Sequence, residues 1–330
     1  MKLEKIWDEW EESHTLDEAT EHSMLSTPRT RKDKLKARLT NSERRGSCVR
    51  KIQCMVPSRI DVGSMNGFGI PGNFLPSQVR RLDIQMVSAP FFYFENVVSS
   101  RSAWSTIQRH FHGIDPEFVD SKYFSCAKRE RGYVHNLPIE GRELIIPEPP
   151  LTIKDAFPEK RPYWPLWDTR KKLECITKKR VPEKKCREIR EKIEQYRGME
   201  IPLLEQQEII STCKEYNLIW VAPGEVANLE PNEMEMALGF DRDHTRGSFT
   251  MKERLESLEN AFQVNTIAYH LSPLKRMFPN GIRLLSLFAG VGGAEVALHK
   301  IGISLRHVVC VEIKEKCRNV VEIWWKKTNQ

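Results

Sequence analysis

The stretch Leu284–Ile313, LLSLFAGVGGAEVALHKIGISLRHVVCVEI, decides the fold. It opens with a continuous apolar run, which is typical of a parallel strand buried on both faces. The segment AGVGG follows as a tight turn, because glycines accept positive φ and let a ligand approach the backbone closely. AEVALHKI predicts a helix that ends at Gly302, and HVVCVEI predicts a second buried strand. The stretch therefore predicts an α/β unit with a ligand site at the carboxyl ends of its strands.

The acid at the end of the second strand indicates a nucleoside ligand. Glu312 lies roughly 20 residues beyond the glycines, where a carboxylate accepts hydrogen bonds from ribose hydroxyls. Dinucleotide sites add a third glycine at a fixed spacing and place the pyrophosphate on the helix N-terminus, and this chain has no glycine at that spacing. S-adenosylmethionine has the ribose but no phosphate. The residues alone therefore allow either NAD or S-adenosylmethionine.

Composition places the chain among globular proteins. It has 330 residues, of which 40% are hydrophobic and 29% charged, with a net charge of +7 and a pI of about 8.9. This basic balance fits a polyanionic partner such as DNA, although a lysine-rich solvated surface fits it too. The eight cysteines form no C-x-x-C pair, so no metal site is expected. Neither a secretory signal nor an apolar run of about 20 residues occurs, which predicts an intracellular protein without a membrane span.

The beginning of the chain is dominated by charge rather than by apolar periodicity. Residues 1–55 run from an acidic segment, EKIWDEWEESHTLDEATEH, into a basic one, TPRTRKDKLKARLTNSERR, and predict a flexible arm. The basic block fits either a nuclear-import or DNA-backbone patch or a solvated linker. Further on, GFGIPG at 67–72 matches G-x-G-x-x-G in form. No strand precedes it and a proline interrupts it, so it predicts an irregular loop.

Between the arm and the glycine unit, strand and helix patterns alternate. The run Phe91–Phe94 predicts a buried strand that delivers Glu95 and Asn96 to its C-terminal end, followed by a helix capped by Ser102. RPYWPLWDTR predicts a loop pinned by ring–proline packing, with a DNA-facing stacking surface as the alternative. EKKCREIREKIEQY, LLEQQEIISTCKEY and NEMEMALGF predict helices, and LIWVAP predicts a strand. The stretch before the glycine unit predicts one long helix, on which His270 serves packing.

Together these segments resemble a known family. LLSLFAGVGGAEVALHKIGI and VVCVEI are similar to motifs I and II of DNA cytosine-5 methyltransferases, and FFYFENV is similar to motif VI. CAKRERGYVHNLPI resembles motif VIII, and LENAFQVNTIAYHL resembles motif X. In most such enzymes motif I comes first, whereas here motifs VI, VIII and X precede motifs I and II. This order resembles that of the plant domains rearranged methyltransferases, and the resemblance extends over most of residues 56–330.

The resemblance implies both the fold class and the domain plan. The implied fold is α/β, a circularly permuted, Rossmann-like, S-adenosylmethionine-dependent methyltransferase fold with a target-recognition insertion, C-terminally incomplete. After the arm, residues 56–139 would hold motifs VI and VIII, and residues 140–240 would form the target-recognition region. Residues 241–280 would hold motifs IX and X. Residues 281–330 would form the cofactor unit of motifs I and II, ending before motif IV.

The resemblance also implies a chemistry and a set of site residues. The family flips a cytosine out of the duplex and attacks its C6 with a cysteine thiolate, so that C5 accepts a methyl group. Carried over, Glu95 would bind N3 of the ring within the catalytic set, which contains Glu95, Asn96, Arg129 and Arg131, and the two arginines would hold the base or the backbone. The implied cofactor-binding residues come from motifs I, II and X, namely Phe288, Gly290, Val291, Gly292, Glu312, Ile313 and Asn260. The implied partner is DNA, in the nucleus, in RNA-directed DNA methylation and gene silencing.

Two departures from the family pattern bear on activity. The family's nucleophile lies in a Pro-Cys loop of motif IV, and no Pro-Cys pair occurs in the 330 residues. Motif X normally reads Gly-Asn, whereas this chain has Glu259 before Asn260. A glutamate there adds charge and volume, and strain if the backbone has positive φ. The first departure predicts the loss of the covalent route, and the second predicts weaker binding of S-adenosylmethionine.

Three hypotheses follow from these patterns. The first is a truncated, non-catalytic member of the family that forms a heterodimer with an active relative and assists it. The second is an active de novo DNA cytosine-5 methyltransferase whose C-terminal motifs lie outside this sequence. The third is an unrelated NAD-dependent enzyme built on the same unit, which no constellation of proton-transfer residues accompanies.

Overall fold

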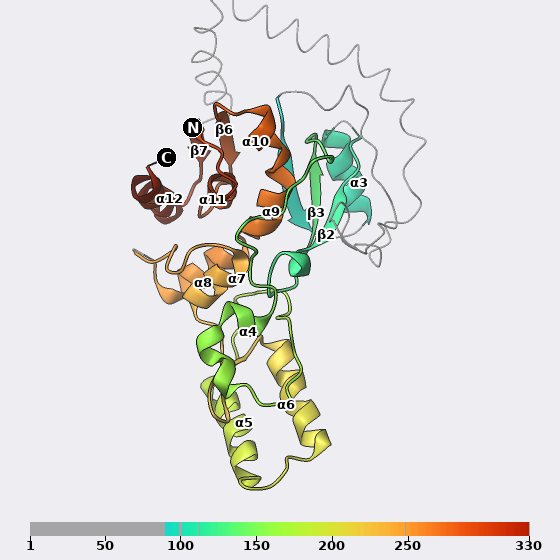
Figure 1. Ribbon diagram of the computed structural model, residues 1–330, viewed down its shortest axis with the longest axis vertical. Coiled ribbons are helices and arrows are strands. Elements are labelled where there is room, and N and C mark those ends of the chain that lie inside the picture. Colours follow the sequence, from blue (N-terminus) through green and yellow to red (C-terminus); the bar gives the residue numbers. More distant parts are fainter. Residues whose placement is uncertain (1–89, 99–100, 112, 248, 330) are drawn as a thin grey trace, which may run out of the picture. The chain divides into compact units, whose positions relative to one another are not determined.

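The computed structural model describes residues 90–98, 101–111, 113–247 and 249–329. The charged arm predicted for residues 1–55 and the GFGIPG loop lie outside these residues. Within them, helices and strands are mixed along the chain, which confirms the α/β class (Figure 1).

The first sheet is antiparallel and contains the predicted Glu95 strand. Its strands are β1 (Tyr93–Val97), β2 (Glu117–Asp120) and β3 (Glu130–His135), in the order β1-β3-β2, and α3 (Arg101–His110) follows β1 (Figure 1). Packing requires Gly132 of β3, because a Cβ there would lie 2.3 Å from the ring of the fully buried Trp104. The aromatic residues on this side of the sheet therefore pack directly against its backbone.

Two predictions for this region are wrong in detail. The strand begins at Tyr93 rather than Phe91 and runs through Glu95, which pairs with Tyr133 instead of following the strand's end. Pairing with β3 extends the strand beyond its aromatic run, and one strand's own periodicity does not reveal its partner. Helix α3 begins at Arg101, so Ser102 lies inside the helix and is not its cap.

Residues 140–240 hold short helices and one hairpin. The elements are α4 (Ile153–Ala156), the 3-10 helix η4 (Pro158–Tyr163), α5 (Glu183–Gln195), α6 (Leu203–Glu215), β4 (Ile219–Ala222), β5 (Glu225–Ala227) and α7 (Pro231–Leu238). β4 and β5 pair in antiparallel fashion. The predictions of α5, α6, β4 and α7 are confirmed. Helix α7 ends at Gly239, whose φ of 85° gives the predicted left-handed stop.

The RPYWPLWDTR segment is held by its own tryptophans and by Trp220 of β4. Trp164 is 7% exposed, and its Nε1 donates to the Asp168 carbonyl at 3.0 Å. Trp220 of β4 donates from Nε1 to the Asp168 carboxylate at 2.7 Å, and its ring meets the Trp167 ring edge to face. The predicted loop is therefore held by indole hydrogen bonds and ring–ring packing. Trp164 is buried and Trp167 is partly buried, so contacts within the protein hold both rings.

The stretch before the glycine unit forms three helices instead of the single long helix predicted. They are α8 (Met251–Glu259), α9 (Val264–Leu271) and α10 (Pro273–Met277). Side-chain caps separate them. Thr250 and Glu253 form a capping box at the start of α8, and Gln263 Oε1 accepts from the Thr266 N–H at the start of α9. Every residue of α9 is buried, so this short helix lies inside the core.

The glycine unit forms the second sheet, a parallel pair. Strands β6 (Ile282–Leu287) and β7 (Leu305–Val311) lie side by side, with α11 (Gly293–Lys300) between them in the chain and α12 (Glu315–Thr328) after them (Figure 1). Both strands were predicted to be buried on both faces, and this is wrong for much of their length, since Leu287 is 47% exposed. Among the described residues, β6 pairs only with β7 and β1 only with β3, so each has an open edge.

A buried ion network connects the first sheet with α9. Arg142 donates from Nη1 and Nη2 to the Glu117 carboxylate at 3.0 and 3.1 Å, and neither side chain is more than 1% exposed. His135 Nε2 lies 3.4 Å from the same carboxylate, while Tyr93 Oη lies 2.7 Å from Nδ1 of His270 on α9. Burial alone would raise the Glu117 pKa, but Arg142 and His135 outweigh it and hold this pKa well below its usual range.

We expect Arg142→Met to remove the guanidinium that pairs with the buried Glu117 carboxylate and to lower the free energy of unfolding by about 3–5 kcal/mol. Urea denaturation at pH 7 measures this loss. Because folding lowers the Glu117 pKa, the wild-type pair stabilises the fold above the carboxyl's unfolded pKa, and this stabilisation declines as the pH falls through the folded pKa. The double variant Glu117→Gln/Arg142→Met should recover part of the loss. Unchanged stability of Arg142→Met would contradict the role given to the pair.

Candidate functional site

The glycine turn between β6 and α11 has a left-handed backbone at three positions. Phe288, Gly290 and Gly292 have φ of 55°, 55° and 83°. Gly292 caps α11, and a Cβ on it would lie 3.0 Å from the Val321 side chain of α12. Positive φ at Phe288 is uncommon for a residue with a side chain, and backbone strain of this kind concentrates at functional sites. The turn is therefore built closely around its glycines, as the sequence predicts.

Glu312 lies across this turn at the end of β7. Its Oε2 accepts from the Gly290 N–H at 2.8 Å, and its Oε1 accepts from the Lys314 N–H at 2.8 Å. Arg318 Nη1 donates to the carbonyl oxygens of Glu312 and Ile313 at 2.6 and 2.9 Å. The carboxylate thereby joins the ends of both parallel strands. Each of its oxygens retains a lone pair that a ligand hydroxyl can reach.

Two apolar side chains at the ends of the same strands are largely exposed to solvent. Phe288 follows β6 and is 87% exposed, while Ile313 follows β7 and is 92% exposed. Leu287 pairs with Val311 in the sheet, so the two strand ends are neighbours. Covering such side chains with a flat apolar ligand would be favourable by about 25 cal/mol per Å² of buried surface. Exposed apolar side chains next to a carboxylate with remaining lone pairs fit the two halves of a nucleoside.

The turn is supported from two sides by residues that the sequence reasoning missed. A Cβ on Gly293 would lie 3.0 Å from Phe262, which therefore packs against the first residue of α11. His244 Nε2 lies 2.7 Å from the Val291 carbonyl oxygen, between the two glycines. Glu295 is fully buried in the first turn of α11, and burial raises its pKa. No local pattern marks the first two as partners of the turn, because the contacts join residues far apart in the chain.

The candidate base-recognition residues lie on the first sheet. The Glu95 carboxylate is 3.1 Å from Arg131 Nε of the paired strand β3, and its side chain is 10% exposed. Burial raises the Glu95 pKa, and the nearby Arg129 and Arg131 only partly offset this effect. Asn96 is exposed, and its Oδ1 accepts from the Val97 N–H at 2.8 Å. Glu95 is thus the acid of this group, and its side chain is largely buried. The Asn96 side chain hydrogen-bonds the backbone at the end of β1.

Arg129 has a different environment from Arg131. Its side chain is buried, and Nη2 donates to the carbonyl oxygens of Glu259 and Ala261 at 3.2 and 2.6 Å. These carbonyls belong to the turn between α8 and α9. In the structure Nη2 of Arg129 holds this turn, and the predicted role of Arg129 in holding the base or the DNA backbone stays a prediction. Through Phe262, the same turn contacts the glycine unit.

The motif X pair, Glu259 and Asn260, makes its side-chain contacts outside the glycine turn. Asn260 is exposed at the end of α8, and its Nδ2 donates to the Glu256 carbonyl at 2.8 Å, so it does not close over the glycine turn by a hydrogen bond. Glu259 lies in the helix and is not among the residues with positive φ. Its carboxylate lies 3.7 Å from Lys178 Nζ. The backbone strain considered for Glu259 is therefore absent. Its carboxylate has a lysine partner that lies outside the glycine turn.

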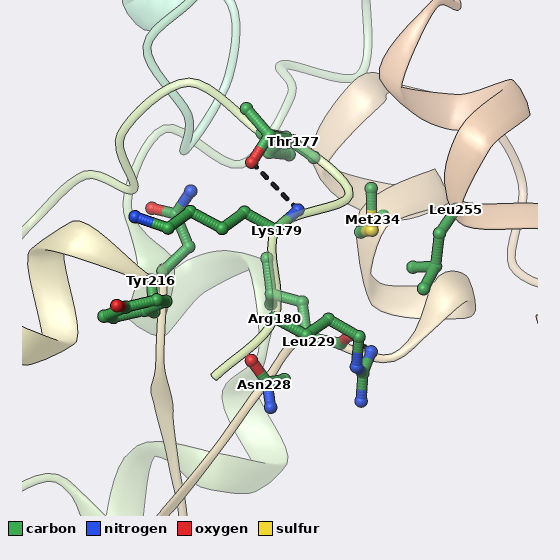
Figure 2. A pocket seen from close by; sticks show the side chains of 10 residues that line it. Thr177, Lys179, Arg180, Tyr216, Asn228, Leu229, Met234 and Leu255 are labelled. Atoms are coloured by element: carbon green, nitrogen blue, oxygen red, sulfur yellow. Dashed lines mark hydrogen bonds between the residues drawn. The ribbon is translucent and has the colours of Figure 1, made fainter. Parts of the chain in front are cut away.

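Other features of the described residues point to no further site of the usual kinds. Figure 2 shows a shallow hollow lined by Lys179, Arg180 and Tyr216, among others, in which the Lys179 N–H donates to Thr177 Oγ1 at 3.2 Å. It lies outside the two groups above. No described helix is long and apolar enough to cross a membrane. In the same part of the chain, no group of three or more His, Cys, Asp or Glu residues could hold a metal ion.

Comparison with known proteins agrees with the family that the motifs indicate. DNA (cytosine-5)-methyltransferase DRM2 of Arabidopsis thaliana is 48% identical over 269 residues, 81% of this chain and 43% of that protein. DRM2 of Oryza sativa subsp. japonica is 46% identical over 80% of this chain and 44% of that protein. A protein of Arabidopsis thaliana named "Probable inactive DNA (cytosine-5)-methyltransferase DRM3" is 38% identical over 80% of this chain and 38% of that protein. No family model matches.

The chain spans less than half the length of these relatives. The matched part includes proteins named as methyltransferases and proteins named as inactive ones. Over the matched four fifths of its length, the chain belongs to the domains rearranged methyltransferase family.

Proposed function

We propose that the chain provides the S-adenosylmethionine site and the base-recognition strand of a nuclear DNA cytosine-5 methyltransferase-like protein. The observation that carries this proposal is the Gly290 N–H bond to Glu312, which places a carboxylate across a glycine turn at the ends of two parallel strands. The motif order and the 46–48% identity to the DRM2 proteins support the finer fold as well. In this proposal the fold is circularly permuted, and residues 140–240 form the target-recognition insertion.

The residues around the glycine turn fit S-adenosylmethionine better than NAD. Glu312 would accept hydrogen bonds from the ribose hydroxyls, and Phe288 and Ile313 would cover the adenine. The third glycine of a dinucleotide site would fall at the position of Glu295, a buried acid, so the turn offers a pyrophosphate a poorer approach. When bound, S-adenosylmethionine supplies an electrophilic methyl group.

The raised pKa of Glu95 suits recognition of a flipped cytosine. A neutral carboxyl can donate a hydrogen bond to N3 of the ring, whereas a carboxylate cannot. Burial favours the neutral form, and Arg131 at 3.1 Å fixes the carboxyl's orientation. Drawing electron density from the ring in this way makes C6 a better target for a thiolate.

Five of the six described cysteines are poorly suited to supply that thiolate. Burial raises the pKa of Cys126 to about 11, of Cys213 to about 12 and of Cys310 to about 11. The pKa values of Cys186 and Cys317 are raised too, again mainly by burial. A nucleophilic cysteine needs a lowered pKa. The sequence also holds no Pro-Cys pair. We therefore propose that the described residues bind cofactor and DNA but do not form the covalent intermediate by themselves.

Two roles are consistent with such a binding unit. The first is a non-catalytic partner that forms a heterodimer with an active relative in RNA-directed DNA methylation. The second is an active enzyme in which a Pro-Cys loop complements these residues. The relatives include proteins whose names fit each role. Methyl transfer to DNA by an active relative, assayed with and without this chain, tests the first role, and no change in rate together with no co-purification would exclude it.

Glu312→Ala should weaken S-adenosylmethionine binding at least about tenfold, because charge-assisted hydrogen bonds to the ribose and to the Gly290 N–H are both lost. Isothermal titration calorimetry measures the affinity. Glu315→Ala is the matched control, since Glu315 is an exposed acid three residues further on. Equal affinity of wild type and Glu312→Ala, or tight binding of NAD instead, would contradict the proposed site.

Glu95→Gln should preserve binding to a duplex with an unpaired target cytosine, while Glu95→Ala should weaken it about tenfold, because only the amide keeps a hydrogen-bond donor for N3. Since the neutral carboxyl prevails below the folded pKa, wild-type affinity should fall as the pH rises through that pKa, and Glu95→Gln should lack this dependence. Fluorescence anisotropy measures both effects. Glu130→Gln, an exposed acid on β3, should behave as wild type.

A further inference from the structure

Hydrogen bonds to the buried Glu235 carboxylate anchor the segment between α7 and α8. The carboxylate of Glu235, which is fully buried, accepts from the Thr245 N–H and from Arg254 Nη2, both at 2.8 Å, and also from the Thr245 hydroxyl. Arg254 Nε donates to Thr245 Oγ1 at 2.9 Å. Asp243 adopts a left-handed φ of 64° inside this segment. These contacts join α7, the connecting segment and α8 into one polar cluster.

His244 is the residue that this cluster presents to the glycine turn. It directly precedes Thr245 in the chain, and its ring stacks on Phe240 with centroids 4.7 Å apart. Its Nε2 lies 2.7 Å from the Val291 carbonyl oxygen. Because a carbonyl accepts but cannot donate, the proton must be on Nε2. Burial lowers the pKa of His244, which favours the neutral ring.

The carbonyl that His244 contacts occupies a sensitive position in the turn. Val291 stands between Gly290, whose N–H bonds Glu312, and Gly292, which caps α11. Both glycines have positive φ, and because they lack a Cβ they restrict the rotation of the two intervening peptides less than other residues would. A hydrogen bond to the Val291 carbonyl therefore restrains the orientation of the peptides on which the Glu312 contact depends.

We propose that His244 is a positioning residue that preorganises the cofactor turn for an adenosine-containing ligand. This inference rests on the proposed S-adenosylmethionine site and adds to it a residue from outside the glycine unit. His244 acts through the Val291 carbonyl and does not touch the ligand. A preordered turn has less conformational freedom to lose on binding, so the hydrogen bond increases affinity.

The test compares three substitutions in the full chain. His244→Phe keeps a ring to stack on Phe240 but has no N–H. His244→Gln keeps an amide N–H at nearly the same distance from the backbone. His299→Phe is the matched control, because His299 lies near the end of α11 that is remote from the turn and packs edge to face on Trp324, with centroids 5.4 Å apart. Calorimetry with S-adenosylhomocysteine gives affinity, and amide hydrogen exchange of unliganded protein reports on the turn peptide around Val291.

We expect His244→Phe to bind S-adenosylhomocysteine about threefold to tenfold more weakly than wild type, the range for one net hydrogen bond. Its turn peptide should exchange faster, while the melting temperature stays close to that of the wild type. His244→Gln should recover most of the affinity and protection, and His299→Phe should retain both. Wild-type affinity and exchange in His244→Phe would overturn the inference.

The two proposals fail in different ways. If wild-type protein does not bind S-adenosylhomocysteine, the proposed function fails, while hydrogen exchange of the unliganded turn still decides whether His244 orders it. If wild type binds and His244→Phe binds equally well with unchanged exchange, the site stands and the role of His244 falls. Should His244→Phe misfold, His244→Asn takes its place, because its shorter side chain cannot reach the Val291 carbonyl.

Discussion

The arrangement of the candidate site depends on the buried guanidinium of Arg129. From the loop that enters β3, it donates to the Glu259 and Ala261 carbonyls and so fixes the turn between α8 and α9. Phe262 in the same turn packs on Gly293, and α9 continues from it into the core. Burying a cation is costly unless it is hydrogen-bonded, so the two bonds from Nη2 restrain the turn. Arg129 thereby connects the sheet that bears Glu95 with the unit that bears Glu312.

The glycine unit could be predicted from the sequence because its signals are local. A strand, a glycine turn, a helix and a second strand follow one another within 30 residues, and Gly239 and Gly302 end their helices as expected. The break between α8 and α9 was missed because it depends on Gln263 acting as a cap, and an apolar helical period runs across it. The burial of β6 and β7 was overestimated because each strand has a single neighbour among the described residues.

The contacts that support the site were beyond sequence reasoning for a different reason. His244 and Val291 are 47 residues apart, and Arg129 and Ala261 are 132 residues apart. Residue type alone does not distinguish an arginine that binds phosphate from one that binds carbonyls inside the protein. Family resemblance implies Asn260 for the cofactor pocket, which stays a prediction; in the structure Phe262, two residues further on, packs against α11. A motif match therefore indicates which region of the chain makes a contact more safely than it indicates which side chain does so.

The proposed function separates binding from covalent chemistry. The glycine turn with Glu312 and the strand with Glu95 are formed, yet the described cysteines with shifted pKa values are all less acidic than a free thiol. The most direct test of the account is a crystal structure of the chain grown with S-adenosylhomocysteine. We predict the ribose hydroxyls on the Glu312 carboxylate and the adenine against Phe288 and Ile313. A ligand bound elsewhere, or a turn that remains empty at saturating ligand, would contradict the account.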